Sequence, residues 1–198
     1  YSYVVTGSIY RYCLADSSTA ALDNTMTLGI YSQDPANPNA NKNLYTSVNV
    51  PLVNIEYVTP PNTNPGCTVG TGVCVQKGTY RATINLPPST GGYHLIYDRC
   101  CRNYNISNLN VTVPPGSGIS YYAFIPPTSI HNNSAQFVSA PVPYVCMGDT
   151  VTVLNSATDA DGDSLVYSFE IPYSGLSNST TPNPTSPNTY TWPIPTVT

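Results

Sequence analysis

"QKGTYRATINLPPSTGGYHLIYDRCCRN", residues 76–103, carries the clearest fold signal in the chain. Its two outer segments, 76–86 and 93–103, are rich in Tyr, Thr, Ile and Leu, which suit β-strands. Between them lies "PPSTGG", whose Pro and Gly residues suit a turn. The stretch therefore predicts two neighbouring antiparallel strands joined by a turn.

The same type of pattern recurs along the chain. Further strands are predicted at 2–13, 25–32, 44–58, 109–113, 119–125, 149–157 and 164–171. Turn signals separate them, and no segment favours a helix longer than a turn or two. Short, regularly spaced strands predict an all-β fold made of antiparallel β-sandwich units, immunoglobulin-like or cadherin-like, stapled by disulfides.

A Pro-rich turn and a polar run near 126–137 divide the strands into two series. We predict an N-terminal β-sandwich domain over 1–131 and a second immunoglobulin-like or cadherin-like β unit over 132–198. The second unit has few strands, and it ends in the Pro-, Ser- and Thr-rich segment 177–198. It is therefore expected to be incomplete.

The composition limits the function classes. Only 8% of the 198 residues are charged, the net charge is −4, and the six basic residues are scattered, which argues against nucleic-acid binding. No run of 18 apolar residues exists, so no transmembrane segment is predicted. A start at Tyr1 is expected of a mature secreted product or an excised fragment.

Six cysteines form an even set: Cys13, Cys67, Cys74, Cys100, Cys101 and Cys146. They contain no CxxC spacing and the chain has only two histidines, so disulfides in an extracellular protein are predicted rather than a zinc site. Adjacent residues of a strand point to opposite faces, so Cys100 and Cys101 are expected to have different partners. If Cys67 and Cys74 close their own short loop, Cys13 and Cys146 pair with Cys100 and Cys101, in either order.

Three carboxylates alternate in "TDADGDSLVYS", namely Asp159, Asp161 and Asp163. Their mutual repulsion would be relieved by a hard cation with oxygen ligands, so calcium is the expected cofactor, with a solvated acidic turn as the alternative. The arrangement is similar to cadherin-like repeats, in which an Asn-rich linker and a later acidic loop share calcium. That resemblance adds Asn133, in "HNNSAQF", to the expected ligands.

Several stretches in order carry a wider resemblance: "GSIYRYC", "LGIYS", "TYRATINLP", "YDRCCRNYNISNL", "NNSAQFVSAPVPYVCMGD" and "ATDADGDSLVYSF". Together they resemble the gliding-motility-associated surface proteins of Bacteroidota, which are commonly exported by type IX secretion. The resemblance implies an adhesin-like or filament-forming extracellular protein. Bacteroidota also modify Asp-Ser/Thr-aliphatic triplets with sugars, and Thr150 and Ser164 lie in such triplets.

The expected function is a non-catalytic structural or adhesive module of a bacterial cell-surface or filament protein. Its expected partners are other copies or further domains of the same protein. The alternative is a glycan-binding module, because exposed Tyr and Trp192 could stack on sugar rings. No enzyme is expected, since His94 and His131 are far apart in sequence and no G-x-S-x-G motif is present.

Overall fold

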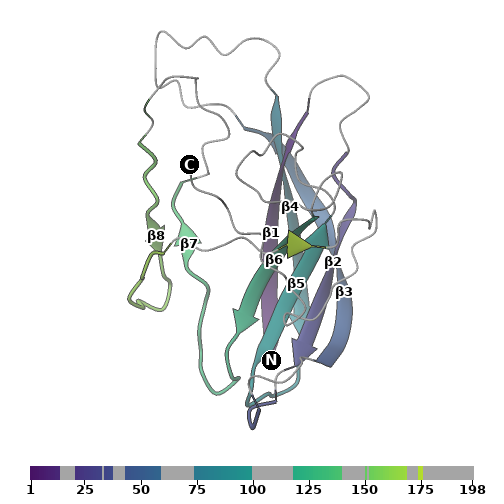
Figure 1. Cartoon of the computed structure of the whole chain (residues 1–198), viewed down its shortest axis with the longest axis vertical. Coiled ribbons are helices and arrows are strands. Elements are labelled where there is room, and N and C mark those ends of the chain that lie inside the picture. Colours follow the sequence, from purple (N-terminus) through teal and green to yellow (C-terminus); the bar gives the residue numbers. More distant parts are fainter. Residues whose placement is uncertain are drawn as a thin grey trace.

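The computed structural model describes residues 1–13, 21–32, 34–37, 43–58, 74–99, 118–139, 150, 152–168 and 174–175. These residues form an all-β, antiparallel structure (Figure 1). The strands are β1 Ser2–Tyr12, β2 Thr25–Ser32, β3 Asn43–Tyr57, β4 Val75–Asn85, β5 Tyr93–Arg99, β6 Gly118–Ile125, β7 Gln136–Phe137, β8 Ala157–Thr158 and β9 Ser174–Gly175. One sheet has the order β1-β4-β3-β2-β5-β6-β9, and β7 pairs with β8 in a separate ladder.

The large sheet curls upon itself, and β3 is the strand about which it turns. The first part of β3 pairs with β2, while its second part, from Leu52 onward, pairs with β4 after a register shift that increases local twist. Two strands that are not neighbours in the sheet, β1 and β2, consequently face each other. A Cβ on Gly7 of β1 would lie 2.8 Å from Cε of Met26 on β2. The all-β prediction is confirmed, whereas the described residues form one large curled sheet and the small β7–β8 ladder and do not show a β-sandwich.

The predicted pairing of 76–86 with 93–103 is wrong. β4 pairs with β1 and β3, and β5 pairs with β2 and β6. The segment that links β4 to β5 starts with Leu86, which is hydrogen-bonded to Tyr1 at the end of the β1–β4 ladder. Two prolines follow, and because they lack N–H donors they cannot continue a ladder between β4 and β5. Strand β5 then takes a central position between β2 and β6, where all residues from Tyr93 to Asp98 are buried, including the polar His94 and Asp98.

The core fills the concave side of the sheet with aliphatic and tyrosine side chains. Its buried members are Met26, Leu28, Ile30, Val50, Tyr80, Ile84, Leu86, Tyr93, Leu95 and Tyr97. Two tyrosine hydroxyls satisfy their hydrogen bonds inside the protein, since Tyr80 Oη donates to the Asp23 carbonyl at 2.8 Å and Tyr93 Oη to the Pro87 carbonyl at 3.0 Å. The tyrosine-rich composition is thus used in part by the core.

A disulfide joins Cys13 to Cys74, with their Cα atoms 4.9 Å apart. The predicted Cys67–Cys74 pairing is therefore wrong, as is the pairing of Cys13 with Cys100 or Cys101. The reason lies in the strand order: Tyr12 faces Val75 in the β1–β4 ladder, so the next positions, Cys13 and Cys74, meet, and Cys13 N donates to the Cys74 carbonyl at 2.8 Å. The remaining four cysteines, Cys67, Cys100, Cys101 and Cys146, lie outside the described residues.

The C-terminal strands differ most from expectation. Residues 152–156 and 164–168 form no strand, so the strands predicted at 149–157 and 164–171 are wrong over the described parts, except for β8. The predicted strand at 109–113 and the segment 177–198 lie outside the described residues. The domain boundary after residue 131 stays a prediction; β9, beyond it, pairs with β6 through Gly118–Gly175 and Ile119–Ser174. Within the described ranges, no helix has the length and hydropathy needed to cross a membrane.

Candidate cation site

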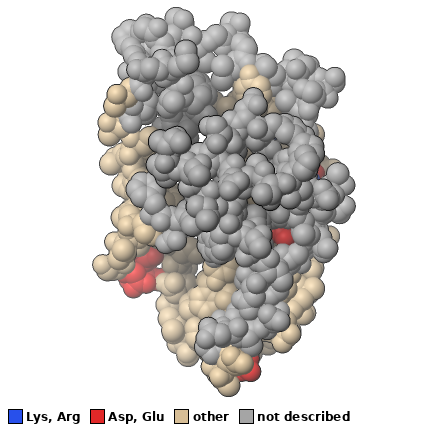
Figure 2. Space-filling model, in the orientation of Figure 1, with Lys and Arg blue, Asp and Glu red and all other residues tan. Residues whose placement is uncertain are grey.

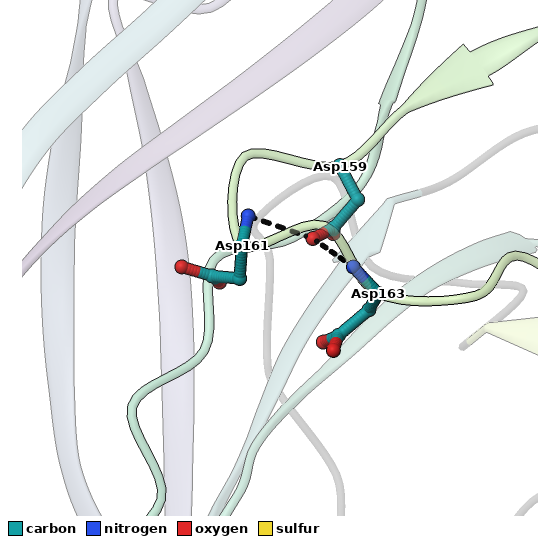
Figure 3. A group of neighbouring side chains, drawn as sticks. All are labelled: Asp159, Asp161 and Asp163. Atoms are coloured by element: carbon teal, nitrogen blue, oxygen red, sulfur yellow. Dashed lines mark hydrogen bonds between the residues drawn. The ribbon is translucent and has the colours of Figure 1, made fainter.

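The acidic residues predicted from the sequence lie together in the loop that follows β8 (Figure 3). One carboxylate oxygen from each of Asp159, Asp161 and Asp163 lies within 4.8 Å of the others. Asp159 shapes the loop, because its Oδ1 accepts hydrogen bonds from Asp161 N at 2.9 Å and from Asp163 N at 3.2 Å. Gly162 permits the turn with a φ of 81°, a value that other residues rarely adopt.

Asp161 also joins the loop to the segment before β7. Asn133 donates to it twice, from its backbone N to Oδ2 and from Nδ2 to Oδ1 at 3.0 Å. His131 Nδ1 lies 3.4 Å from the same Oδ1. The Asp161 side chain is only 20% exposed because these groups lie against it, although the residue as a whole is exposed. Asp161 is therefore the residue that connects the two halves of the site.

We use the name acidic hairpin for residues 131–139 and 152–168, which contain β7, β8 and this loop. The β7–β8 ladder has two residue pairs, Gln136–Thr158 and Phe137–Ala157, extended by a bond from Val138 N to the Ser156 carbonyl at 2.9 Å. Tyr167 Oη accepts a hydrogen bond from Ala157 N at 2.9 Å. None of the described acidic-hairpin residues is buried, so polar contacts hold this region together.

Two residues of the site were missed in the sequence, Asn132 and His131. With its amide in the orientation that satisfies its neighbours, Asn132 Nδ2 donates to Asp163 Oδ2 at 3.1 Å. Both residues flank the predicted ligand Asn133, and the signal that could have found them is the concentration of polar side chains in "HNNS". Asn133 itself is placed as predicted, beside the acidic loop.

The loop carries negative charge that no Lys or Arg nearby in the sequence offsets. The hydrogen bond from the Asn133 backbone, followed by those of its amide and by the nearby His131, holds the pKa of Asp161 below its ordinary value, so this carboxyl is ionised at neutral pH. All six basic residues of the sequence precede residue 103, whereas residues 103–198 contain five acidic ones: Asp149, Asp159, Asp161, Asp163 and Glu170. The sequence around the loop therefore supplies no Lys or Arg to neutralise it.

The position of the charge is visible on the surface. Figure 2 shows red acidic atoms gathered at the lower left, over the loop after β8, beside uncharged tan residues. Ion pairs of the main sheet lie elsewhere, with Lys77 Nζ 2.7 Å from Glu56 Oε1 and Arg99 Nη1 2.9 Å from Asp23 Oδ2. The acidic hairpin is thus a separate negative site.

The donor set fits a hard divalent cation. Carboxylate oxygens are the ligands that calcium prefers, and the loop brings three of them together on an exposed surface, where water can complete the coordination. Asn133 donates through Nδ2 in this structure, so it would have to turn its amide to offer Oδ1 to an ion. The cluster Asp159, Asp161 and Asp163 could hold a metal ion.

The other predicted surface sites have mixed outcomes. Thr150 and Ser164 are both exposed, and their glycosylation stays a prediction. Trp192 lies outside the described residues. His94 is 7% exposed and its ring contacts those of Tyr122 and Phe124, with Nδ1 2.8 Å from Tyr122 Oη.

No protein-family model, curated protein or solved structure matches the chain. The fold and the site define the chain as an all-β, disulfide-linked protein with an exposed acidic cluster able to take a cation. The disulfide is typical of proteins from oxidising compartments.

Proposed function

We propose that this chain is a non-catalytic structural module of a secreted or cell-surface bacterial protein, in which calcium fastens the acidic hairpin. The observation that carries the proposal is the bridge between two segments: Asp161 contacts Asn133 from the region before β7 while sharing a carboxylate cluster with Asp159 and Asp163. An ion bound there would order both segments at once. The motifs quoted above support placement among the adhesin-like surface proteins of Bacteroidota, with further copies or domains as partners.

Calcium would act on the acidic hairpin by removing repulsion. Three carboxylates within 4.8 Å repel one another at neutral pH, and no buried core offsets that repulsion in this region. Extracellular calcium modules bind weakly, with Kd on the order of 10⁻⁴ to 10⁻³ M, because the ambient ion concentration is high. Mass action then makes the order of the hairpin depend on calcium concentration.

Some tyrosines serve the core, while seven others among the described residues are exposed and keep glycan binding as the alternative: Tyr1, Tyr12, Tyr45, Tyr57, Tyr121, Tyr122 and Tyr167. Four tyrosines are buried in the main sheet: Tyr31, Tyr80, Tyr93 and Tyr97. The hydroxyls of Tyr80 and Tyr93 donate hydrogen bonds to backbone carbonyls inside the protein. A sugar platform needs exposed rings with free polar neighbours, whereas these rings supply core volume. The aromatic composition that suggested a glycan module is thus accounted for in part by packing.

The test is calcium-dependent thermal unfolding of the native, disulfide-intact chain. We expect millimolar calcium to raise the Tm relative to excess chelator, and Asp161→Asn to abolish most of that difference. Asp34→Asn is the matched control, since Asp34 is an exposed acid whose Oδ1 accepts a hydrogen bond from Ala36 N in a turn outside the cluster. An identical Tm with calcium and with chelator would contradict the proposal.

A further inference from the structure

Strand β1 forms one edge of the large sheet and pairs with β4 along eleven consecutive positions without a register shift. Its hydrogen bonds to β4 can be assigned to alternate residues. Tyr1 exchanges two bonds with Leu86, from Tyr1 N to the Leu86 carbonyl at 2.9 Å and from Leu86 N to the Tyr1 carbonyl at 2.9 Å. At the other end Cys13 N bonds the Cys74 carbonyl, so the odd-numbered residues of β1 face β4.

The even-numbered residues must therefore point their N–H and C=O groups away from β4. These are Ser2, Val4, Thr6, Ser8 and Tyr10, and in the described part of the chain no strand pairs with them. Their side chains lie on the outer face, where Ser2, Val4, Thr6 and Ser8 are exposed. Over Ser2–Tyr10 the edge is thus a row of accessible, outward-directed backbone donors and acceptors.

This edge lacks the features by which proteins normally block strand addition. Charged side chains, prolines, bulges and short length all discourage pairing at a sheet edge. Ser2–Tyr10 has no charged residue and no proline, and its pairing register is regular. The opposite edge differs, because β6 already pairs with β9 and its residues Gly118, Ser120, Tyr121 and Tyr122 make additional contacts.

We propose that two copies of this chain pair through their β1 edges, antiparallel and two-fold symmetric about Thr6. The inference deepens the proposed function by naming the surface through which copies meet, and it rests on that function only for the structural role of the contact. A second copy is the occupant that the segment Ser2–Tyr10 specifies, because a two-fold register about Thr6 pairs this segment with itself and its uncharged residues do not repel their own copy.

The register follows from the positions. Pairing about Thr6 is the two-fold arrangement that uses all nine uncharged residues from Ser2 to Tyr10 and sets outward-pointing backbone groups opposite one another. It places Thr6 opposite Thr6 and Val4 opposite Ser8 of the partner subunit. On the inner face it sets aromatic Tyr3 opposite β-branched Ile9, a favourable cross-strand pair, and Val5 opposite Gly7.

Sedimentation equilibrium with Thr6 variants tests the inference. We expect the native chain to dimerise, and Thr6→Lys or Thr6→Glu alone to weaken the dimer about tenfold or more, because like charges then face each other at the two-fold axis. An equimolar mixture of the two variants should recover the dimer. Thr83→Lys is the matched control, since Thr83 is exposed on β4, one strand inside the edge, and it should leave dimerisation unchanged.

Two results would overturn the inference: a native chain that stays monomeric at high concentration, or a dimer that Thr6→Lys leaves intact. The β1 register would also be overturned if Thr83→Lys weakened the dimer as much as Thr6→Lys does. It would be overturned too if the mixture of Thr6→Lys and Thr6→Glu formed aggregates larger than dimers. Thermal unfolding of each variant confirms that it is folded. These outcomes do not depend on calcium, so failure here is distinct from failure of the cation proposal.

Discussion

The main sheet and the acidic hairpin are stabilised in opposite ways. In the sheet, ten buried apolar or tyrosine residues form a single core, and a disulfide closes the end of the β1–β4 ladder. In the hairpin no described residue is buried, and polar contacts such as those of Asp161 with Asn133 act together with a two-pair strand ladder. The sheet should therefore hold its structure by itself, whereas the hairpin should depend on solution conditions.

The disulfide should give the largest difference in stability between the main sheet and the hairpin. The double variant Cys13→Ala with Cys74→Ala removes a cross-link between residues 61 positions apart, which the chain-entropy relation values at about 4 kcal/mol. We expect a loss of about 2 to 4 kcal/mol in the unfolding free energy of the main sheet, measured by denaturant unfolding. The calcium response of the hairpin should survive. A loss below about 1 kcal/mol would show that the cross-link does not stabilise the sheet.

A matched pair of Val→Ala substitutions compares burial in the two regions. Val50 on β3 is fully buried, whereas Val166 in the hairpin is 92% exposed. We expect Val50→Ala to lower the unfolding free energy by about 2 kcal/mol through lost burial and a cavity, and Val166→Ala to change it by less than about 0.5 kcal/mol. Equal effects in denaturant unfolding would contradict the difference between the regions.

Two core tyrosines differ in whether their hydroxyl groups are hydrogen-bonded. Tyr97 is 1% exposed and its hydroxyl has no hydrogen-bond partner among the described residues, whereas Tyr80 donates to the Asp23 carbonyl. Removing a hydroxyl that is unsatisfied should be neutral or stabilising, and removing a bonded one should cost about 1 kcal/mol. We therefore expect Tyr97→Phe to raise or preserve the Tm and Tyr80→Phe to lower it. The reverse order would mean that Tyr97 has a partner in solution.

The two regions should also respond to opposite extremes of pH. The pKa of Asp161 is lowered, mainly by the Asn133 backbone, so its contribution is complete above about pH 4 and is lost as pH falls through its lower folded value. Burial raises the pKa values of Tyr80, Tyr93 and Tyr97, so the main sheet keeps their contribution below about pH 10 and loses it as pH rises further.

Acid should therefore loosen the hairpin first and alkali should unfold the sheet. Region-resolved hydrogen exchange in acid, and tyrosinate absorbance with circular dichroism in alkali, measure the two effects. Asp161→Asn should flatten the acid response of the hairpin, because it removes the titrating group. A hairpin that loosens only together with the sheet, at both extremes, would contradict the independence of the two regions.

The sequence predicted the strands that are marked by patterns within short segments. The first six strands were expected within a few residues of their bounds, because period-two alternation and turn residues are properties of short segments. Pairing was not predictable in this way. The arrangement of β4 and β5, and hence the Cys13–Cys74 bond, depends on contacts between distant segments, and the assumed hairpin at 87–92 led to the wrong neighbours.

The candidate site shows the same limit. Asp159, Asp161 and Asp163 were found because they alternate in one loop, and Asn133 was found through resemblance. Asn132 and His131 were missed, since their part in the site depends on how the loop folds back on the segment before β7. The apolar alternation of 149–157 and 164–171 predicted two full strands, of which the described residues form only the short β8.

Hydrogen exchange resolved by region, with and without calcium, measures directly whether a cation orders the acidic hairpin. The native chain is compared in millimolar calcium and in excess chelator, with Asp161→Asn measured alongside. We expect calcium to slow exchange in residues 131–139 and 152–168, to leave β1 to β5 unchanged, and to have little effect in the variant. No change in the acidic hairpin, or an equal change throughout the main sheet, would contradict a cation that fastens the two segments of the hairpin to each other and leaves the sheet unaffected.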